Sequence, residues 1–145
     1  MSKSDFTNIL TIPVSWIDQD LLGHVNNAQY FSYLESGRVE YCVKALGIEF
    51  VPGMKAGWIL ADIQCSYLQQ IRFPQQLEIC SRISQIGNKS ATIVAHIYRL
   101  GETNPVATSQ GIIVWFDYVK QKTERIPESI RQMIVDYEKS VDVSD

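Results

Sequence analysis

A single long amphipathic helix, expected over residues 27–46, limits what this chain can fold into. Its apolar residues recur with helical spacing on one side, which comprises Phe31, Leu34, Cys42 and Ala45 and is widened by Tyr30, Tyr41 and Leu46. At 1.5 Å per residue, such a helix is about 30 Å long. A helix of this length that is apolar on one side needs a sheet to cover it.

Both ends of this helix carry sequence signals. Asn26 is a good N-cap, and Gln29 lies where a capping box places its second side chain. Val25 and Tyr30 occupy the two positions of a hydrophobic staple. At the other end, Gly47 is the expected stop in the left-handed conformation. The sequence therefore predicts a helix that begins near residue 27 and ends at residue 46.

The remainder of the chain predicts a sheet. Gly87-Asn88 is a tight hairpin signal and 101–105 is a slightly longer turn, so the strands that they join should be antiparallel. Pro127 is expected to open a short terminal helix with an apolar stripe of Ile130, Met133, Ile134 and Tyr137. This order predicts an α+β fold in which a curved antiparallel sheet wraps one long central helix. The expected strands cover residues 9–17, 58–69, 76–86, 90–100 and 106–117.

Length and composition restrict the class of protein. A chain of 145 residues suits one domain, expected over residues 1–145, and is short for two. The net charge of -3, without a run of basic residues, argues against nucleic acid as a partner. No window approaches the apolar length that a membrane span needs. Three cysteines without metal-ligand spacing, and a charged start without a following apolar run, predict a soluble cytoplasmic protein with reduced thiols.

The polar run Asp18-Gln-Asp-Leu-Leu-Gly-His-Val-Asn-Asn27 directly precedes the helix. The first backbone N–H groups of a helix lack intrahelical acceptors, so those of Asn27 and Ala28 are natural donors to an oxyanion. Asp20 can be brought close to these donors, since Gly23 lets the backbone turn sharply. A carboxylate in that place can attack a polarised carbonyl or activate water against it. By spacing alone, a purely structural role is favoured, in which the carboxylates cap the helix while His24 and the asparagines satisfy hydrogen bonds of the loop, because polar clusters before helices are common.

The run Asp20-x-x-Gly-His-Val-Asn-Asn-Ala-x-Tyr30, with Glu35 and Arg38 spaced to pair one turn apart in the helix, resembles the 4-hydroxybenzoyl-CoA thioesterase-like family of hotdog-fold acyl-CoA thioesterases. The likeness extends over nearly the whole chain and includes the turn Ile86-Gly-Asn-Lys-Ser90. The resemblance implies a single hotdog domain. It also implies dimers joined edge to edge through their sheets, often assembled as tetramers, with the active site at the subunit interface.

The same resemblance implies roles for individual residues. Asp20 matches the catalytic aspartate, and Asn27 matches the position whose backbone N–H polarises the thioester carbonyl. Lys89 and Ser90 match a turn that often contacts the nucleotide end of coenzyme A. His24 and Asn26 match a motif shared with plant acyl-carrier-protein thioesterases, in which the histidine is considered catalytic; those enzymes have asparagine where this chain has Leu22.

The sequence thus predicts hydrolysis of acyl-CoA thioesters without a metal or other cofactor. The expected catalytic residues are Asp20, His24 and Asn27, and the expected substrate-binding residues are Gly23, Asn26, Trp58, Lys89 and Ser90. Trp58 could line an acyl pocket, although an aromatic residue at a strand start is more often part of the core. Arg72, Arg82 and Arg99 are expected to be solvated or paired, with phosphate contact as the minority interpretation. Two alternatives stay open: an acyl-carrier-protein thioesterase and a non-catalytic acyl-CoA-binding protein.

Overall fold

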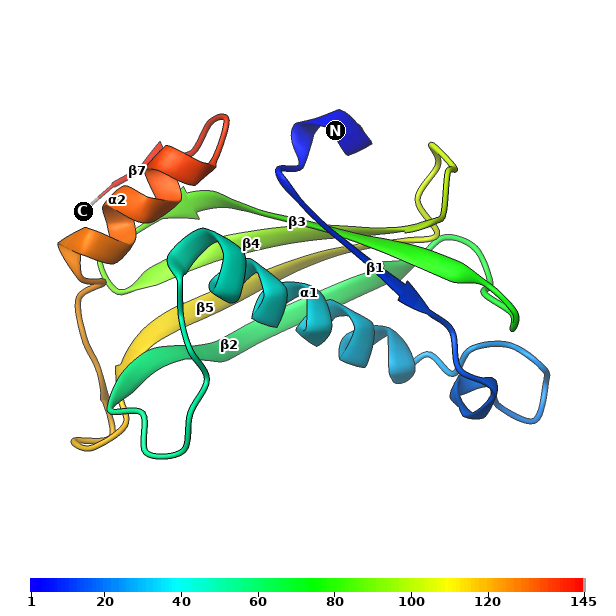
Figure 1. Ribbon diagram of the computed structural model, residues 1–145, viewed down its shortest axis with the longest axis horizontal. Helices are drawn as coiled ribbons and strands as arrows, with labels where there is room; N and C mark the ends of the chain where they lie inside the picture. The colour runs from blue at the N-terminus through cyan, green and yellow to red at the C-terminus, as the bar shows by residue number, and fades with distance from the viewer. Residues whose placement is uncertain (145) are drawn as a thin grey trace.

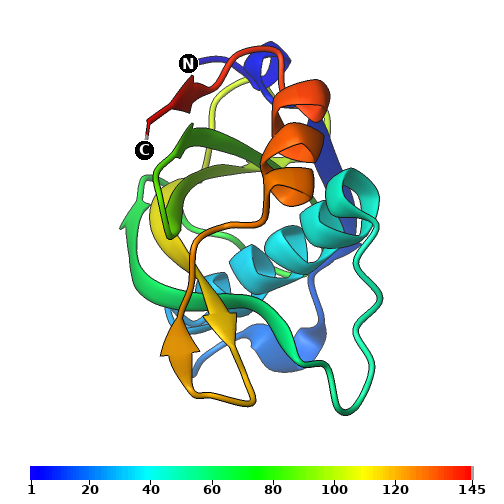
Figure 2. The same ribbon diagram turned by 90° about the vertical axis from the view of Figure 1, so that its left-hand side faces the viewer.

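The long helix α1 (Gln29–Leu46) lies along the concave side of one strongly curved antiparallel sheet. This arrangement is seen in the computed structural model, which describes residues 1–144 (Figures 1 and 2). The main strands lie in the order β1 (Asn8–Pro13), β3 (Gln76–Ile86), β4 (Ser90–Arg99), β5 (Ala107–Asp117) and β2 (Ala56–Tyr67). It is the hotdog arrangement of one helix and one wrapped sheet that the sequence predicts.

Short elements complete the chain. The second helix, α2 (Glu128–Tyr137), packs beside the C-terminal part of α1 (Figure 2). The two-residue strand β6 (Lys122–Thr123) pairs with β5, and β7 (Asp142–Val143) pairs in parallel with β3. Register shifts between Leu60 and Asp62 and between Ile83 and Gln85 add local twist, which helps the sheet to curve around the helix.

The N-terminal strand is shorter than the sequence predicts. It ends at Pro13, because β1 is the outer strand beside β3 and the chain then leaves the sheet. Residues Trp16–Asp18 form a turn of 3-10 helix instead of the expected strand end. This turn carries the chain around to the N-terminus of α1 (Figure 1).

The C-terminal end of α1 confirms the prediction. Gly47 has φ +59° and ψ 26°, in the left-handed region that favours glycine. Its N–H donates to the Val43 carbonyl at 3.2 Å, while the Ile48 N–H donates to the Cys42 carbonyl at 3.1 Å. These two bonds satisfy carbonyls that the helix end would otherwise leave without donors.

Of the hydrophobic core clusters among the described residues, two lie below α1, one at each half of the helix. Between them Gly37 faces β3, and a Cβ atom there would lie 2.7 Å from Cγ2 of Ile79 and 2.9 Å from Oγ of Ser81. Only glycine therefore lets the helix approach the sheet so closely. Two expected core residues are partly exposed, Phe31 at 36% and Met133 at 43%, since both lie at the margins of their apolar stripes.

The carboxylate of Glu138, just after α2, is buried and joins four parts of the chain. It accepts hydrogen bonds from the Thr7 hydroxyl at 3.0 Å, the Tyr41 hydroxyl at 2.9 Å and the Ile83 N–H at 2.7 Å. Burial, followed by the charge and hydrogen bond of Glu138, raises the pKa of Tyr41 above its ordinary value. The Tyr41 phenol therefore stays protonated and donates to the carboxylate.

We expect Glu138→Ala to lower the free energy of unfolding by about 3 kcal/mol, because it leaves three donors, two of them buried, without their charged acceptor. Chemical denaturation monitored by circular dichroism measures this loss. Glu128→Ala is the matched control, since Glu128 is 81% exposed and its ion pairs are long, and it should cost less than about 1 kcal/mol. Equal effects of the two substitutions would contradict this role for Glu138.

Two further findings concern the described residues. No helix among residues 1–144 is long and apolar enough to cross a membrane. Cys42, Cys65 and Cys80 are free, and burial raises the pKa of the Cys42 thiol to about 11 and that of Cys80 to about 12. At neutral pH both thiols are protonated and pack as small apolar groups.

Candidate active site

Asp18 holds the loop between β1 and α1 in place. Its Oδ2 accepts the Ser15 N–H at 2.9 Å and the Tyr33 hydroxyl at 2.8 Å, and its carbonyl accepts the Asn26 N–H at 2.9 Å. Burial, and then the hydrogen bond to Asp18, raises the pKa of Tyr33. These contacts make the Asp18 carboxylate a structural anchor between the loop and the helix.

Asp20 is held differently. Its Oδ1 accepts the Leu22 N–H at 2.8 Å, and its carbonyl accepts the Gly23 N–H at 3.1 Å. The tight turn is closed where Gly23 adopts φ +79° and the Asp20 N–H donates to the His24 carbonyl at 2.8 Å. No described residue, from 1 to 144, hydrogen-bonds the second carboxylate oxygen, Oδ2. One oxygen thus orients the carboxylate while the other is available to a ligand.

The N-terminus of α1 differs in detail from the prediction. Asn26 does not cap the helix through a capping box; its side-chain Oδ1 accepts the Ala28 N–H at 2.9 Å, and its carbonyl accepts the Gln29 N–H at 2.9 Å. Residues 27 and 28 therefore form a turn, with Ala28 as the N-cap of a helix that begins at Gln29. Both the Asn27 and the Ala28 N–H groups were expected to be without acceptors, but the Ala28 N–H is hydrogen-bonded to Asn26.

The Asn27 N–H has no acceptor among residues 1–144. It lies at the N-terminus of an 18-residue helix, where the helix dipole places partial positive charge. On the other side of the same residue, the Asn27 carbonyl accepts the Tyr67 hydroxyl at 3.1 Å. That bond ties the turn to the end of β2 and orients the peptide group.

The His24 imidazole contacts an arginine and not the Asp20 carboxylate. Its Nε2 lies 2.9 Å from Nη2 of Arg72. A guanidinium group can only donate hydrogen bonds, so Nε2 must accept this one and the ring proton is on Nδ1. His24 is thereby oriented from the loop 68–75, which the sequence did not place beside the helix.

Asp20, His24 and Asn27 line one open cleft of about 340 Å³. Tyr30 and Tyr67 form part of its wall and meet edge to face, with ring centroids 4.9 Å apart. Sequence reasoning missed Tyr67, and it predicted Arg72 to be solvated or paired without placing it beside His24. Their contacts depend on β2 pairing with the distant strand β5, with Tyr67 opposite Ala107, and no local pattern in the sequence indicates that register.

Trp58, Lys89 and Ser90 lie at the other end of the molecule. Ser90 is opposite Val114 of β5 and Trp58 is opposite Trp115 near the start of β2. Tyr67, which lines the cleft, is the last residue of β2, and the two ends of this long strand lie far apart (Figure 1). Lys89 is exposed in the turn between β3 and β4. One chain therefore does not bring these three residues to Asp20.

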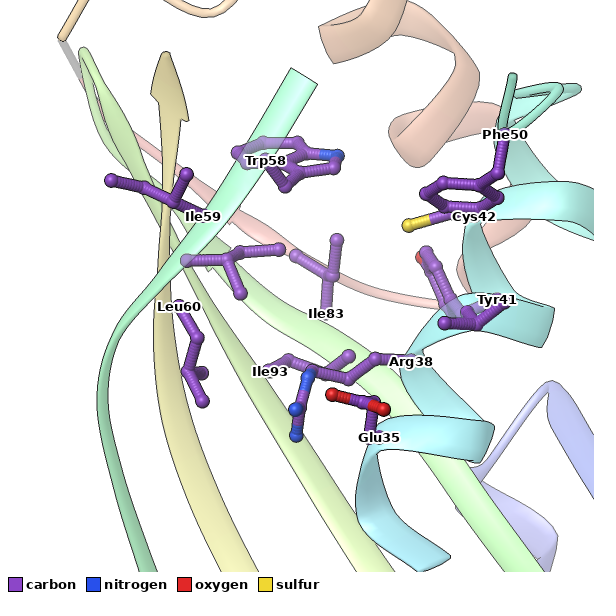
Figure 3. Close-up of a pocket in the computed structure, with 12 residues that line it drawn as sticks. Glu35, Arg38, Tyr41, Cys42, Phe50, Trp58, Ile59, Leu60, Ile83 and Ile93 are labelled. Carbon is purple, nitrogen blue, oxygen red and sulfur yellow. The ribbon is translucent and has the colours of Figure 1, made fainter. Parts of the chain in front are cut away.

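A second cavity, of about 200 Å³, lies between α1 and the sheet (Figure 3). Trp58 and Phe50 lie at one end of it, and Glu35 and Arg38 at the other. The Trp58 indole packs edge to face on Trp115 at 5.0 Å. Most of the remaining wall is apolar and includes Ile83, Ile93 and Ile113.

Comparison with known proteins identifies the family of this chain. Residues 14–134 match the model of the thioesterase-like superfamily. The chain is 33% identical to the acyl-acyl carrier protein thioesterase ATL3 of Arabidopsis thaliana, over 81% of this chain and 62% of that protein. It therefore spans about three fifths of the length of this relative.

Solved structures agree in fold. A protein of Pseudomonas aeruginosa superposes with a TM-score of 0.87 at 21% identity, over 97% of each chain. A thioesterase of Thermus thermophilus, solved as a complex with coenzyme A and Zn, superposes with a TM-score of 0.78 at 27% identity, over 92% of this chain and 96% of that one. The chain belongs to the thioesterase-like superfamily.

Proposed function

We propose that this protein hydrolyses acyl-CoA thioesters to a free acid and coenzyme A. The observation that carries this proposal is the cleft lined by Asp20 and Asn27, in which Oδ2 of Asp20 and the N–H of Asn27 have no hydrogen-bond partner among residues 1–144. Membership of the thioesterase-like superfamily supports the reaction class, and a relative solved with coenzyme A supports the carrier.

In the proposed reaction the thioester carbonyl oxygen accepts the Asn27 N–H, which makes the carbonyl carbon more electrophilic. Oδ2 of Asp20 then takes a proton from water as the water oxygen attacks, or attacks the carbon itself to form an anhydride that water later hydrolyses. The tetrahedral intermediate collapses with loss of the coenzyme A thiolate, which takes up a proton from solvent. A thiolate leaves readily, so the site needs no strong general acid.

The other predicted residues have supporting roles in this proposal. Gly23 permits the turn that presents Asp20, and Asn26 fixes the turn before the helix. The Nδ1–H of His24 is a donor at the rim of the cleft, available to the substrate. His24 assists binding in this scheme, while Asp20 and the Asn27 N–H act on the reacting atoms.

The position of Lys89 and Ser90 supports an assembly of subunits. Strand β2 is twelve residues long, pairs on one side with β5, and has no partner on its other edge within residues 1–144. An unpaired edge of this length readily pairs with another chain. We propose a homodimer, or a homotetramer built from it, in which the turn at Lys89 and Ser90 of one subunit binds the nucleotide end of the coenzyme A whose thioester lies in the other.

An acyl carrier protein is the second candidate carrier. Arg72 and Arg99 line a polar cavity of about 400 Å³ that shares Gln70 with the Asp20 cleft. Two guanidinium groups beside the mouth of the cleft would suit the phosphate of a carrier's 4′-phosphopantetheine arm, a phosphate that coenzyme A also contains. The name of the Arabidopsis relative favours the same carrier.

Steady-state hydrolysis of matched thioesters tests the proposal. Lauroyl and shorter acyl groups are presented on coenzyme A and on an acyl carrier protein, and release of the thiol is measured. We expect kcat/KM to be higher for the coenzyme A thioesters than for the same acyl groups on the carrier protein. A higher kcat/KM for the carrier-protein thioesters would instead identify the acyl carrier protein as the carrier. Tight binding of the thioesters without turnover would instead identify a binding protein.

A further inference from the structure

The guanidinium group of Arg38 lies inside the apolar cavity without a partner. Arg38 is half-buried on α1, and Figure 3 shows its side chain extending from the helix toward the strands. Within residues 1–144 it makes no hydrogen bond and no ion pair shorter than 4 Å. Burial lowers the pKa of Arg38 from its ordinary value, although the group stays charged at neutral pH. A half-buried cation whose N–H donors are unbonded is costly, and an acceptor from outside the described chain would lower that cost.

Glu35 balances this charge without bonding to it. The Glu35 carboxylate points toward the guanidinium in Figure 3, and its charge raises the pKa of Arg38, but the expected salt bridge is not formed. The pair is close to neutral overall. An anionic ligand would therefore be attracted by Arg38 but repelled by Glu35. A neutral acceptor could hydrogen-bond to the guanidinium without that repulsion.

The opposite end of the cavity offers a second donor. The Nε1–H of Trp58 is buried and has no hydrogen-bond acceptor in the described chain. The Cys42 thiol is protonated, since burial raises its pKa to about 11. Apart from Glu35, the polar groups that line the cavity are donors or are bonded elsewhere, as the Tyr41 hydroxyl is to Glu138. Among the described residues, Glu35 is therefore the side chain of this lining that offers a strong acceptor, and neither the Arg38 guanidinium nor the Trp58 N–H is bonded to it.

A further hollow extends from the cavity along α1 in the direction of the helix N-terminus. Glu35, Arg38 and Leu60 also line a second hollow, of about 290 Å³, which extends along α1 to Phe31. Phe31 directly follows Tyr30 in α1, and the Tyr30 side chain lines the Asp20 cleft. At 1.5 Å per residue, the distance along the helix from Gln29 to Arg38 is about 14 Å. A medium-length acyl chain whose thioester carbonyl accepts the Asn27 N–H is therefore long enough to place its far end beside Arg38.

We infer that the groove between α1 and β2 holds the acyl chain, and that Arg38 selects chains with a neutral oxygen substituent, a hydroxyl or keto group, near their distal end. This inference rests on the proposed function, because it assumes that the thioester lies at Asp20. The selected class is an acyl group whose oxygen is remote from the thioester. A hydroxyl next to the thioester would lie near Asn27 and would not reach the guanidinium.

The test compares pantetheine thioesters, because pantetheine is common to coenzyme A and to carrier proteins. The probes are lauroyl, β-hydroxylauroyl, ω-hydroxylauroyl and ω-carboxylauroyl pantetheine, together with their non-hydrolysable thioether analogues. For the wild-type chain, the ω-hydroxyl compound should show a kcat/KM about tenfold above that of the lauroyl compound, and its thioether should bind more tightly by a similar factor. The β-hydroxyl and ω-carboxyl compounds should show no such advantage.

Two variants test the charges of Arg38 and Glu35 separately. Arg38→Met should abolish the preference for the ω-hydroxyl chain, so that the ratio of its kcat/KM to that of the lauroyl compound falls from about ten to about one. Glu35→Gln leaves Arg38 uncompensated, so it should shift the preference toward the ω-carboxyl chain. Lys44→Met is the matched control, because Lys44 is an exposed cation on the same helix, paired with Glu40, and does not line the cavity. Thermal unfolding confirms that each variant folds.

The outcomes distinguish this inference from the proposed function. Hydrolysis of all four thioesters at similar rates would overturn the inference and leave the function standing. Loss of dimers in Arg38→Met, with chain preference unchanged, would identify Arg38 as an interface residue and also overturn the inference. If no thioester is hydrolysed, the proposed function fails, and equal binding of the thioethers would overturn the inference as well.

Discussion

Asp20→Asn is expected to lower kcat for thioester hydrolysis by about a hundredfold to ten-thousandfold, the range typical of a lost general base. The substitution is nearly isosteric, and the asparagine Oδ1 can still accept the Leu22 N–H that orients the carboxylate at 2.8 Å. Only the charge and basicity of the free oxygen are removed. KM should therefore change much less than kcat, which steady-state kinetics on the preferred thioester will measure.

Asp18→Asn is the matched control in the same loop. Asp18 anchors the loop through the Ser15 N–H and the Tyr33 hydroxyl, so its replacement should lower the melting temperature more than Asp20→Asn does. Its kcat should stay within about tenfold of the wild-type value, since a shifted loop positions Asp20 less well. An Asp20→Asn enzyme with wild-type kcat would remove Asp20 from the mechanism.

Asn27→Pro is expected to lower kcat by about a hundredfold to a thousandfold, because proline lacks the N–H that would stabilise the oxyanion. Proline is well tolerated at the first positions of a helix, and the Asn27 N–H has no acceptor in the described chain. The folded protein should therefore retain its structure, as circular dichroism and thermal unfolding can show. A loss of kcat in the folded variant would then report on the missing N–H or on the missing amide side chain, and Asn27→Ala separates the two.

Asn27→Ala distinguishes the backbone from the side chain. Alanine retains the N–H, so this variant should keep kcat within about threefold of the wild-type value if the backbone donor is what matters. A large loss in Asn27→Ala, equal to that in Asn27→Pro, would assign the role to the Asn27 amide side chain instead.

Local signals in the sequence predicted the local structure well. The helix end at Leu46 and Gly47, the strand 76–86 and the hairpin at Gly87 are where periodicity and turn residues indicate them. The curved sheet around one helix also agrees, because the long apolar stripe of α1 has no other way to be covered. The family resemblance is confirmed by the match of residues 14–134.

The start of the helix was predicted two residues too early. Asn26 has two competing uses for its side-chain oxygen, and the structure has it accept the Ala28 N–H within a turn. This hydrogen bond occupies the Ala28 N–H, one of the two donors that the sequence analysis expected to be available to an oxyanion. The sequence could narrow the oxyanion site to two adjacent N–H groups, and the turn geometry leaves only the Asn27 N–H without an acceptor among residues 1–144.

Long-range features of the site could not be read from the sequence. The contacts of Arg72 with His24 and of Tyr67 with Asn27 exist because β2 lies at the sheet edge and its C-terminal end passes the helix N-terminus. Likewise, the spacing of Glu35 and Arg38 suggested an ion pair, but the guanidinium extends into the cavity instead. Side-chain direction in a groove depends on the opposite wall, which local spacing does not describe.

The most direct test of the central claim is a crystal structure with an acyl-CoA analogue in which a methylene group replaces the thioester sulfur and the carbonyl is retained. We expect the carbonyl oxygen to accept the Asn27 N–H at about 2.9 Å. The carbonyl carbon should lie about 3–3.5 Å from Oδ2 of Asp20, or one water molecule away from it. A carbonyl bound elsewhere, with Asp20 and the Asn27 N–H both facing solvent, would contradict the assignment of this cleft as the active site.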